Sequence, residues 1–214
     1  MGLGAFHKAH QAVYVQRAIN NGQKLAIAAV SQRDPKEANS LAQLGFKYVQ
    51  AFGIKGLMIQ SEFNQVRPFT YSHGMPDQNY GHYGLPLAHP LGANFKEGLL
   101  LLQYFRGRWQ AGADLMLSLQ GRDSSAKGLN YGSDIFRSYI DRASEFGNFT
   151  GQGVLHTTRQ AHLKLGYLLV PAWQMKLELG FIQRWTNSSA GYVLQEPYLY
   201  FALKTALWNR YRDY

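Results

Sequence analysis

The chain has 214 residues, a formal net charge of +9 and no cysteine. This length suffices for one large or two small domains with a buried core, and the lack of cysteine excludes disulfides and thiolate metal sites. Charged residues make up only 16% of the sequence, whereas aromatic residues reach 14% and glycine occurs 22 times, a mixture that favours strands and turns. No apolar run reaches the roughly 18 residues of a membrane-spanning helix.

The chain begins with the stretch GLGAFHKAHQAVYVQRAIN, residues 2–20, for which we predict a short helical segment. The stretch resembles the start of the mannitol dehydrogenase and fructuronate reductase family, in which a glycine turn at a helix N-terminus binds the cofactor pyrophosphate. The resemblance implies that Gly2, Gly4 and Phe6 contact NAD, and that residues 24–33 form the second Rossmann strand.

The continuation of the sequence argues against a working NAD site. Met1 leaves no room for a first Rossmann strand, and no strand–helix–strand pattern follows Arg33. We therefore interpret residues 1–35 as a dehydrogenase-like remnant or a foreign join, and keep a fragment of an NAD-dependent polyol or uronate dehydrogenase as the alternative. Residues 24–32 fit equally well as an extra strand of the sheet predicted below. The first apolar stretch is interrupted by basic and histidine residues, so we expect no signal peptide here, and an exported protein would need a longer precursor.

From residue 41 onward, apolar and polar residues alternate as in two-sided β-strands. The clearest case is RWQAGADLMLSLQGRD, residues 108–123, in which Trp109 and the leucines share one parity while Asp114 and the glutamines share the other. Only Met116 breaks the pattern. Seven such runs occur, most about ten residues long, at residues 43–48, 57–64, 97–105, 108–123, 160–167, 174–184 and 198–208.

The connections between these runs alternate in length. FGIKG, RGR and VPAW are short, whereas residues 67–95, 123–158 and 186–196 form long links rich in Gly, Pro, Asn, Ser and Tyr. Outer-membrane barrels combine strands of this length with short turns at one end and long loops at the other. We therefore predict an all-β fold over residues 36–214: an antiparallel up-and-down meander of seven or eight strands, forming part of an outer-membrane β-barrel. A soluble β-protein with a lipid-like pocket is the alternative.

Aromatic residues lie at or near the ends of the predicted strands, where amphipathic rings favour a membrane interface. They are Phe52, Tyr104, Phe105, Trp109, Trp173, Trp185 and Trp208. The last residue, Tyr214, matches the aromatic ending that serves outer-membrane barrels as part of their assembly signal.

Several long phrases also carry a family resemblance. They are QLGFKYVQAFGIKGLMIQSEFNQVRPFTYSH, NYGHYGLPLAHPLGANFKE, NYGSDIFRSYIDRASEFGNFTGQG and FALKTALWNRYRDY. These phrases resemble the C-terminal part of outer-membrane proteins of capsule assembly (Wzi-like) and gliding motility (RemB-like). The resemblance implies a barrel in the bacterial outer membrane that holds or organises extracellular polysaccharide without enzymatic activity. It also implies that the chain is a C-terminal fragment of a longer protein.

The first long link supplies candidate glycan-binding residues, because Tyr and His rings stack on sugar faces and basic groups meet anionic sugars. The candidates are Arg67, Tyr71, His73, Tyr80, His82, Tyr83 and Lys96. Alternatively, the link folds into the barrel mouth and its rings serve packing. The three histidines of this link match no compact metal-ligand spacing, so we expect no metal site.

The polar parity of the strands carries charges that a barrel lumen would accommodate. They are Lys47, Glu62, Asp114, Lys164, Lys176, Glu178 and Arg184. Their basic members could guide an acidic polymer or small anions, but we favour pairing with the acidic members across neighbouring strands. The alternation with lipid-type residues argues against a nucleic-acid surface. The expected partners are outer-membrane lipid, the barrel-assembly machinery and acidic surface polysaccharide, and we expect no catalytic residue or cofactor.

Overall fold

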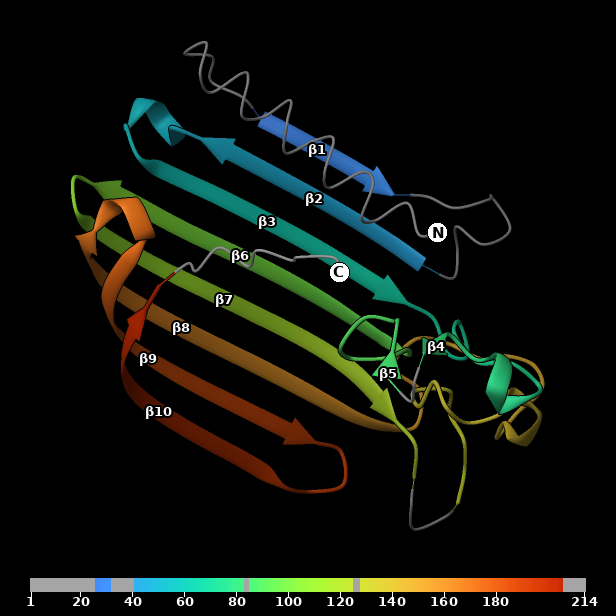
Figure 1. The fold of residues 1–214 in the computed structure, drawn as a ribbon. Helices are drawn as coiled ribbons and strands as arrows, with labels where there is room; N and C mark the ends of the chain where they lie inside the picture. The colour runs from blue at the N-terminus through green and yellow to red at the C-terminus, as the bar shows by residue number, and fades with distance from the viewer. Residues whose placement is uncertain (1–25, 32–40, 83–84, 125–127, 206–214) are drawn as a thin grey trace, which may run out of the picture.

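The computed structural model describes residues 26–31, 41–82, 85–124 and 128–205. These residues form an antiparallel sheet of eight strands in the order β1-β2-β3-β6-β7-β8-β9-β10, so the prediction of an all-β fold is confirmed (Figure 1). The strands are β1 (Ala26–Ser31), β2 (Leu41–Val49), β3 (Leu57–Val66), β6 (Phe95–Arg106), β7 (Trp109–Arg122), β8 (Val154–Val170), β9 (Met175–Ser188) and β10 (Val193–Lys204). Among them, β1 and β10 form the two open edges of the sheet.

The predicted extra strand is confirmed at the β1 edge. β1 pairs antiparallel with β2, with Ala28 opposite Phe46 and Ala29 opposite Gly45. Gly2, Gly4 and Phe6, together with the predicted helical segment, lie outside the described residues. None of the helical segments in the described part of the chain has the length and apolar character of a membrane-crossing helix.

Short turns lie at one end of the sheet and the two longest connections at the other, as the alternation of link lengths predicts (Figure 1). The turn end carries the short helices η1 (Ala51–Gly53) and η5 (Pro171–Trp173), with the turn at Gly107 between β6 and β7. The loop end carries η2 (Pro76–Gln78), η4 (Tyr139–Asp141) and a hairpin of β4 (Gly81–His82) with β5 (Leu85–Pro86).

The prediction of a third long link over residues 186–196 is wrong. Only residues 189–192 connect β9 to β10, because Asn187 pairs with Val193 and the ladder continues through Trp185 and Gln195. Asn, Ser and Gly in this stretch favour turns locally, but cross-strand backbone pairing extends the strands through them. For the same reason the strands exceed the predicted length, and β8 reaches 17 residues. At the C-terminal end β10 stops at Lys204, and Trp208 lies outside the described residues.

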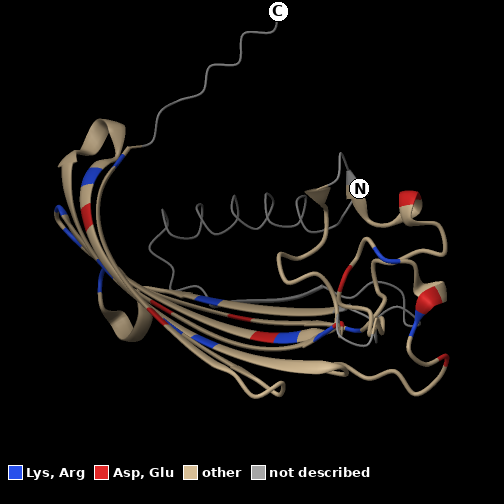
Figure 2. Cartoon of the chain, turned by 90° about the horizontal axis from the view of Figure 1, so that it is seen from below, with Lys and Arg blue, Asp and Glu red and all other residues tan. Residues whose placement is uncertain are grey.

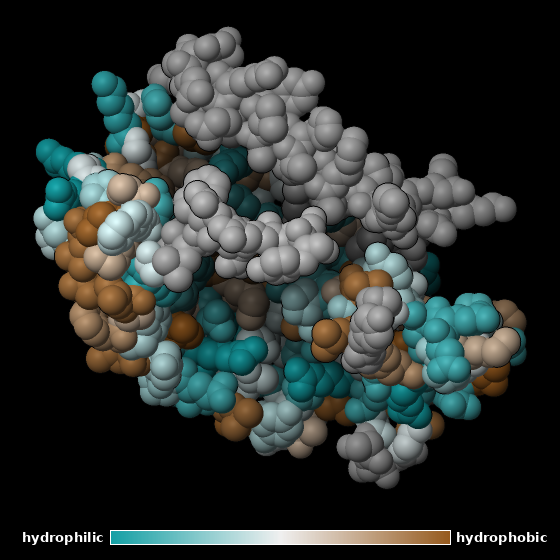
Figure 3. Space-filling view, in the orientation of Figure 1, coloured by the Kyte–Doolittle hydropathy of each residue, from teal (hydrophilic) through white to brown (hydrophobic). Residues whose placement is uncertain are grey.

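The sheet is strongly curved, so its two faces differ in access to solvent (Figure 2). We call the face that carries Asp114, Ser118 and Gln120 the concave face, and the face that carries Leu115 and Leu117 the convex face. The register confirms that each face is continuous, since Leu115 lies opposite Leu100 on β6 and Ala161 on β8, whereas Asp114 lies opposite His162. Leu117 is 49% exposed and its neighbour Ser118 only 2%. In Figure 3 hydrophilic residues occupy the hollow, and hydrophobic residues lie along its left margin.

The distribution of apolar residues is the reverse of that in a water-soluble domain. In the described part of the chain the buried apolar residues are few, namely Ala51, Val66, Ala93, Phe95 and Ile135. Exposed leucine and phenylalanine side chains run along the convex face instead, at Leu44, Phe46, Phe63, Leu115, Leu117, Leu119, Leu163, Leu165, Leu179, Phe181, Leu199, Phe201 and Leu203. Polar residues are buried on the opposite face, among them Asn64, Glu97, Ser118, Gln120, His156, Thr158 and Glu178.

Candidate functional site

A network of polar side chains crosses β7 to β10 on the concave face. We call it the concave-face cluster, and its members are Asp114, His162, Lys164, Lys176, Glu178, Tyr200 and Lys204. All are placed there by strand parity, because side chains two residues apart in a strand project from the same face. The cluster combines two carboxylates with three lysines, a histidine and a tyrosine.

Asp114 is the first carboxylate centre of the cluster. Its Oδ2 atom lies 2.5 Å from Lys164 Nζ and 3.3 Å from His162 Nδ1, both on the neighbouring strand β8. Its Oδ1 atom is buried and accepts no hydrogen bond from a described residue. Asp114 therefore joins β7 to β8 through its charge-assisted contact with Lys164.

Glu178 is the second centre, and its side chain is only 4% exposed. Its Oε1 atom accepts hydrogen bonds from Lys204 Nζ at 2.5 Å and from the Tyr200 hydroxyl at 2.7 Å. Its Oε2 atom lies 3.0 Å from Lys176 Nζ, which also donates to Gln110 Oε1 at 3.1 Å. A carboxylate withdrawn from water in this way needs such donors, since an unpaired buried charge is strongly unfavourable.

The predicted pairing of charges across strands is therefore found for Asp114 with Lys164, whereas Lys176 pairs with Glu178 on its own strand. Glu62 accepts a hydrogen bond from Gln60 Nε2 at 2.7 Å. Within the described residues, no ion pair joins Lys47, Glu62 or Arg184 to an opposite charge.

At the loop end, the two long connections fold against one another. Phe69 N–H donates to the Gly132 carbonyl at 3.1 Å, Ala93 N–H donates to the Ser133 carbonyl at 3.2 Å, and the Ser138 hydroxyl donates to the Gly74 carbonyl at 2.8 Å. We call the described residues of 67–94 and 123–153 together the loop assembly. Its internal hydrogen bonds make it an ordered surface rather than a set of separate loops.

Asn94 anchors the loop assembly to the sheet. Its side-chain amide donates to the carbonyls of Gly121 and Gln152 at 2.8 and 2.9 Å, and its Oδ1 atom accepts from Gly151 N–H at 2.7 Å. Asn94 is fully buried and has a positive φ of 61°, a backbone conformation that asparagine tolerates better than most residues. This side chain therefore holds both long connections to the end of β7.

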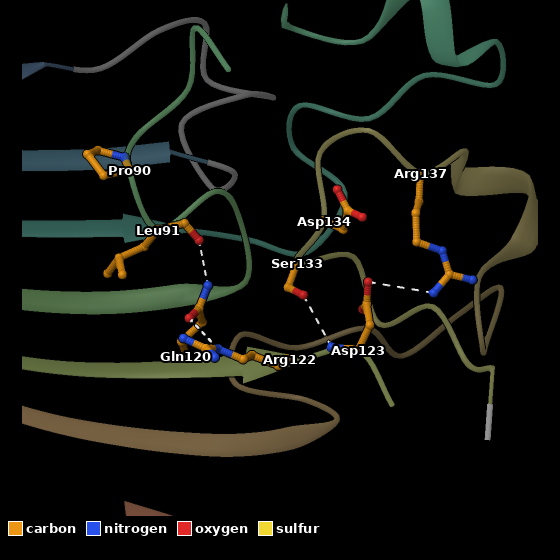
Figure 4. Close-up of a pocket in the computed structure, with 8 residues that line it drawn as sticks. All are labelled: Pro90, Leu91, Gln120, Arg122, Asp123, Ser133, Asp134 and Arg137. Atoms are coloured by element: carbon orange, nitrogen blue, oxygen red, sulfur yellow. Dashed lines mark hydrogen bonds and ion pairs between the residues drawn. The ribbon is translucent and has the colours of Figure 1, made fainter. Parts of the chain in front are cut away.

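A polar cleft of about 400 Å³ opens where the loop assembly meets the end of β7 (Figure 4). Its lining residues are Pro90, Leu91, Gln120, Arg122, Asp123, Ser133, Asp134 and Arg137. We call it the loop-end cleft. Gln120 Nε2 donates to the Leu91 carbonyl at 2.5 Å, and Asp123 N–H donates to Ser133 Oγ at 3.2 Å, so both long connections form its walls.

The predicted glycan-binding residues are only partly brought together. Tyr71 and Tyr80 stack with ring centroids 5.6 Å apart, and Tyr71 also packs against the cluster of Val66, Ala93 and Phe95. For Tyr71, the structure therefore agrees with the alternative prediction that the rings of this link serve packing.

The remaining candidates are dispersed. Arg67 Nη2 donates to the Asn148 carbonyl at 3.3 Å, and the His73 ring packs edge-on against Tyr139. Lys96 shares the parity of the convex face on β6, where it lies opposite Leu119. Tyr83 and the side chain of His82 lie outside the described residues.

The histidines of the first long connection also have separate surroundings. His89 Nε2 lies 3.1 Å from Glu97 Oε2, and its ring packs 4.5 Å from that of Phe95. No group of three or more His, Asp or Glu side chains in the described part of the chain is arranged to hold a metal ion.

Sequence reasoning missed two groups of residues. His162, Tyr200 and Lys204 have the polar parity of their strands, so alternation places them on the right face but does not reveal their mutual contacts. The charged residues of the loop-end cleft, Arg122, Asp123, Asp134 and Arg137, lie at a strand end or in an irregular connection, where no period identifies neighbours.

A scan against protein-family models found no match, and searches of curated proteins and of solved structures found no significant similarity.

Proposed function

We propose that this chain is a portion of a β-barrel embedded in the bacterial outer membrane, where it serves surface polysaccharide attachment or gliding motility without an enzymatic step. The observation that carries the proposal is the inverted polarity of the sheet. Large apolar side chains are exposed along the convex face, and charged and polar side chains are withdrawn on the concave face. Acyl chains outside and water inside would satisfy both faces.

The free energy of burial explains why this polarity matters. Burying a leucine or phenylalanine side chain is worth about 1.5–3 kcal/mol, so each half-exposed side chain on the convex face forgoes on the order of 1 kcal/mol in water. The row extends over β7, β8, β9 and β10, for example through Leu117, Leu163, Leu179 and Phe201. An apolar environment around these side chains removes this cost.

Exposed aromatic rings at the turn end also support an outward-facing convex face in a membrane. Trp109 is 54% exposed beside Tyr167, and Phe52 and Trp173 are also exposed near this end, whereas Phe105 lies on the concave face opposite Gln110. Trp and Phe at this level fit the girdle at a membrane–water interface. The turn end would then lie on the periplasmic side, and the loop assembly would face the cell exterior, where polysaccharide is met.

Membrane insertion is tested by refolding the chain with detergent or phospholipid vesicles. We expect heat-modifiable migration in gels, and quenching of tryptophan fluorescence by lipids brominated near the headgroup, because Trp109 and Trp173 would lie at the interface. A chain that stays soluble without detergent and shows neither signal contradicts the proposal.

The surface role is tested separately in the bacterium that carries the gene. Loss of the gene is expected to shift polysaccharide from the cell-bound to the released fraction or to reduce colony spreading, and the intact gene is expected to restore the lost property. Unchanged retention and unchanged spreading would contradict the surface role while leaving membrane insertion standing.

A further inference from the structure

The loop-end cleft contains charged groups with unused hydrogen-bonding capacity. Arg122 ends β7 and is exposed, and its Nε–H donates to Gln120 Oε1 at 3.0 Å, which orients the guanidinium plane (Figure 4). In the part of the chain that the structure describes, the two terminal nitrogens of Arg122 donate to no acceptor. One edge of the guanidinium therefore remains available to a ligand.

The positive charge of the second arginine, Arg137, is balanced by groups of the protein itself. Arg137 Nη2 donates to the Gly128 carbonyl at 3.2 Å, and its Nη1 lies 3.8 Å from Asp123 Oδ2. Asp123 is fixed in turn, because its Oδ1 atom accepts Tyr131 N–H at 2.6 Å. Arg137 and Asp123 thus balance each other, and Arg122 is the cation in the cleft that has no ion-pair partner among the described residues.

A carboxylate and a hydroxyl line another part of the same cleft (Figure 4). Asp134 Oδ1 accepts Phe136 N–H at 2.9 Å, while its other oxygen accepts no hydrogen bond from a described residue. Ser133 accepts Asp123 N–H through its oxygen, so its own proton is available for donation. A cleft with a free guanidinium edge in one part and a carboxylate oxygen and a hydroxyl in another suits a ligand that carries both hydroxyl groups and a single negative charge.

We propose that the loop-end cleft binds a carboxylate-bearing sugar, a uronic acid unit, with its carboxylate on Arg122 and its hydroxyls on Asp134 and Ser133. Guanidinium and carboxylate form paired parallel hydrogen bonds, which fixes the orientation of the sugar. Asp123 and Asp134 beside the site disfavour a dianionic phosphate. The volume of about 400 Å³ lies in the range of small-ligand sites and has room for one sugar unit. This inference rests on the proposed surface role and names its ligand class.

The test compares three probes on the whole chain refolded in detergent, by saturation-transfer NMR and calorimetry. Methyl glucuronide and methyl glucoside differ only in the carboxylate, and glucose 6-phosphate presents a dianion. We expect the glucuronide to bind about tenfold more tightly than either other probe, as one charge-assisted contact would give. Equal binding of glucuronide and glucoside, or tighter binding of the phosphate, would overturn the choice of a carboxylate, and binding of none of the three would overturn the site.

Variants locate the binding and separate it from the proposed function. Arg122→Gln is expected to weaken glucuronide binding about tenfold and Arg122→Lys by less, whereas the control Arg106→Gln, at the exposed turn end of β6, leaves it unchanged. Equal affinity of Arg122→Gln and the parent chain would overturn the inference. Heat-modifiable migration of each sample reports folding and insertion independently. If that shift persists without glucuronide binding, the cleft inference fails alone; if Arg122-dependent binding occurs in a chain that does not insert, the membrane proposal fails and the site stands.

Discussion

His162 on β8 and Tyr200 on β10 meet across the strand that separates them, with His162 Nε2 2.9 Å from the Tyr200 hydroxyl. The hydroxyl has one proton, which it donates to Glu178, so its oxygen serves as the acceptor for His162 Nε2–H. The Tyr200 ring lies directly over Gly180 of β9, and the missing side chain makes the crossing possible. The curvature of the sheet brings the two side chains together on the concave face, and their contact in turn stabilises that curvature.

Removal of the Tyr200 hydroxyl is expected to weaken the junction of β8, β9 and β10. Tyr200→Phe keeps the ring over Gly180 but deprives Glu178 of one donor and His162 of its acceptor, at a cost of about 1–2 kcal/mol in the free energy of unfolding. The control Tyr198→Phe changes an exposed ring whose hydroxyl bonds to no described residue, and is expected to alter stability by less than about 0.5 kcal/mol. Urea unfolding of refolded protein, followed by tryptophan fluorescence, measures both. Equal midpoints would show that the hydroxyl contributes nothing.

Gly180 is expected to tolerate no side chain. A Cβ atom at this position would overlap the Tyr200 ring, so Gly180→Ala must displace the ring from His162 and is expected to destabilise the sheet by about 1–3 kcal/mol. Gly45 lies on β2 and faces the same side of the sheet as Gly180. A Cβ atom added at Gly45 would have no neighbour within 4 Å, so Gly45→Ala is expected to be neutral or slightly stabilising. Thermal unfolding of the two variants compares the sites. A Gly180→Ala protein as stable as the parent would contradict the packing described above.

A charge on the convex face is expected to oppose membrane insertion. Leu115→Arg places a guanidinium on the face assigned to lipid, where the cross-strand neighbours are Leu100 and Ala161, and should cost about 2–4 kcal/mol near the midplane. Met116→Arg places the same group at the same depth on the opposite face, where it meets the polar hollow, so it serves as the matched control. The folded fraction in phospholipid vesicles, read from heat-modifiable migration, measures the effect. If both variants inserted equally well, neither face would be the lipid face, and worse insertion of Met116→Arg would reverse the assignment.

Asn94 is expected to control the order of the loop assembly. Asn94→Gly removes the side-chain hydrogen bonds but suits the positive φ, whereas Asn94→Ala adds about 1 kcal/mol of backbone strain to the same loss. Both variants should be cleaved faster by trypsin within residues 123–153, Asn94→Ala most, while the strand signal in circular dichroism is retained. Asn187→Ala, at an exposed site on β9, is the control. Cleavage rates equal to that of the parent chain would show that other contacts hold the loops.

The alternation of residue types is a local property, and it predicted most of the sheet. The period of two in residues 108–123 placed Leu117 and Asp114 on opposite faces before any partner strand was known. The register keeps the two parities on opposite faces through β6, β7 and β8, with Lys96 and Arg159 as charged residues on the face of Leu117. The same reasoning failed over residues 186–196. Thr186 and Asn187 pair with β10 inside this stretch, and Asn187 and Ser188 also pair with the distant strand β8.

The sequence by itself determined the strands, their parity and the antiparallel connectivity, because a strand exposes consecutive side chains to opposite sides whatever its neighbours are. Only the tertiary structure decided which polar residues meet. His162 reaches Tyr200 because the sheet curves and Gly180 leaves space, and Arg122 shares a cleft with Asp134 because the long connections fold back on the end of β7. Such contacts join segments far apart in the chain, and no repeating local pattern encodes them.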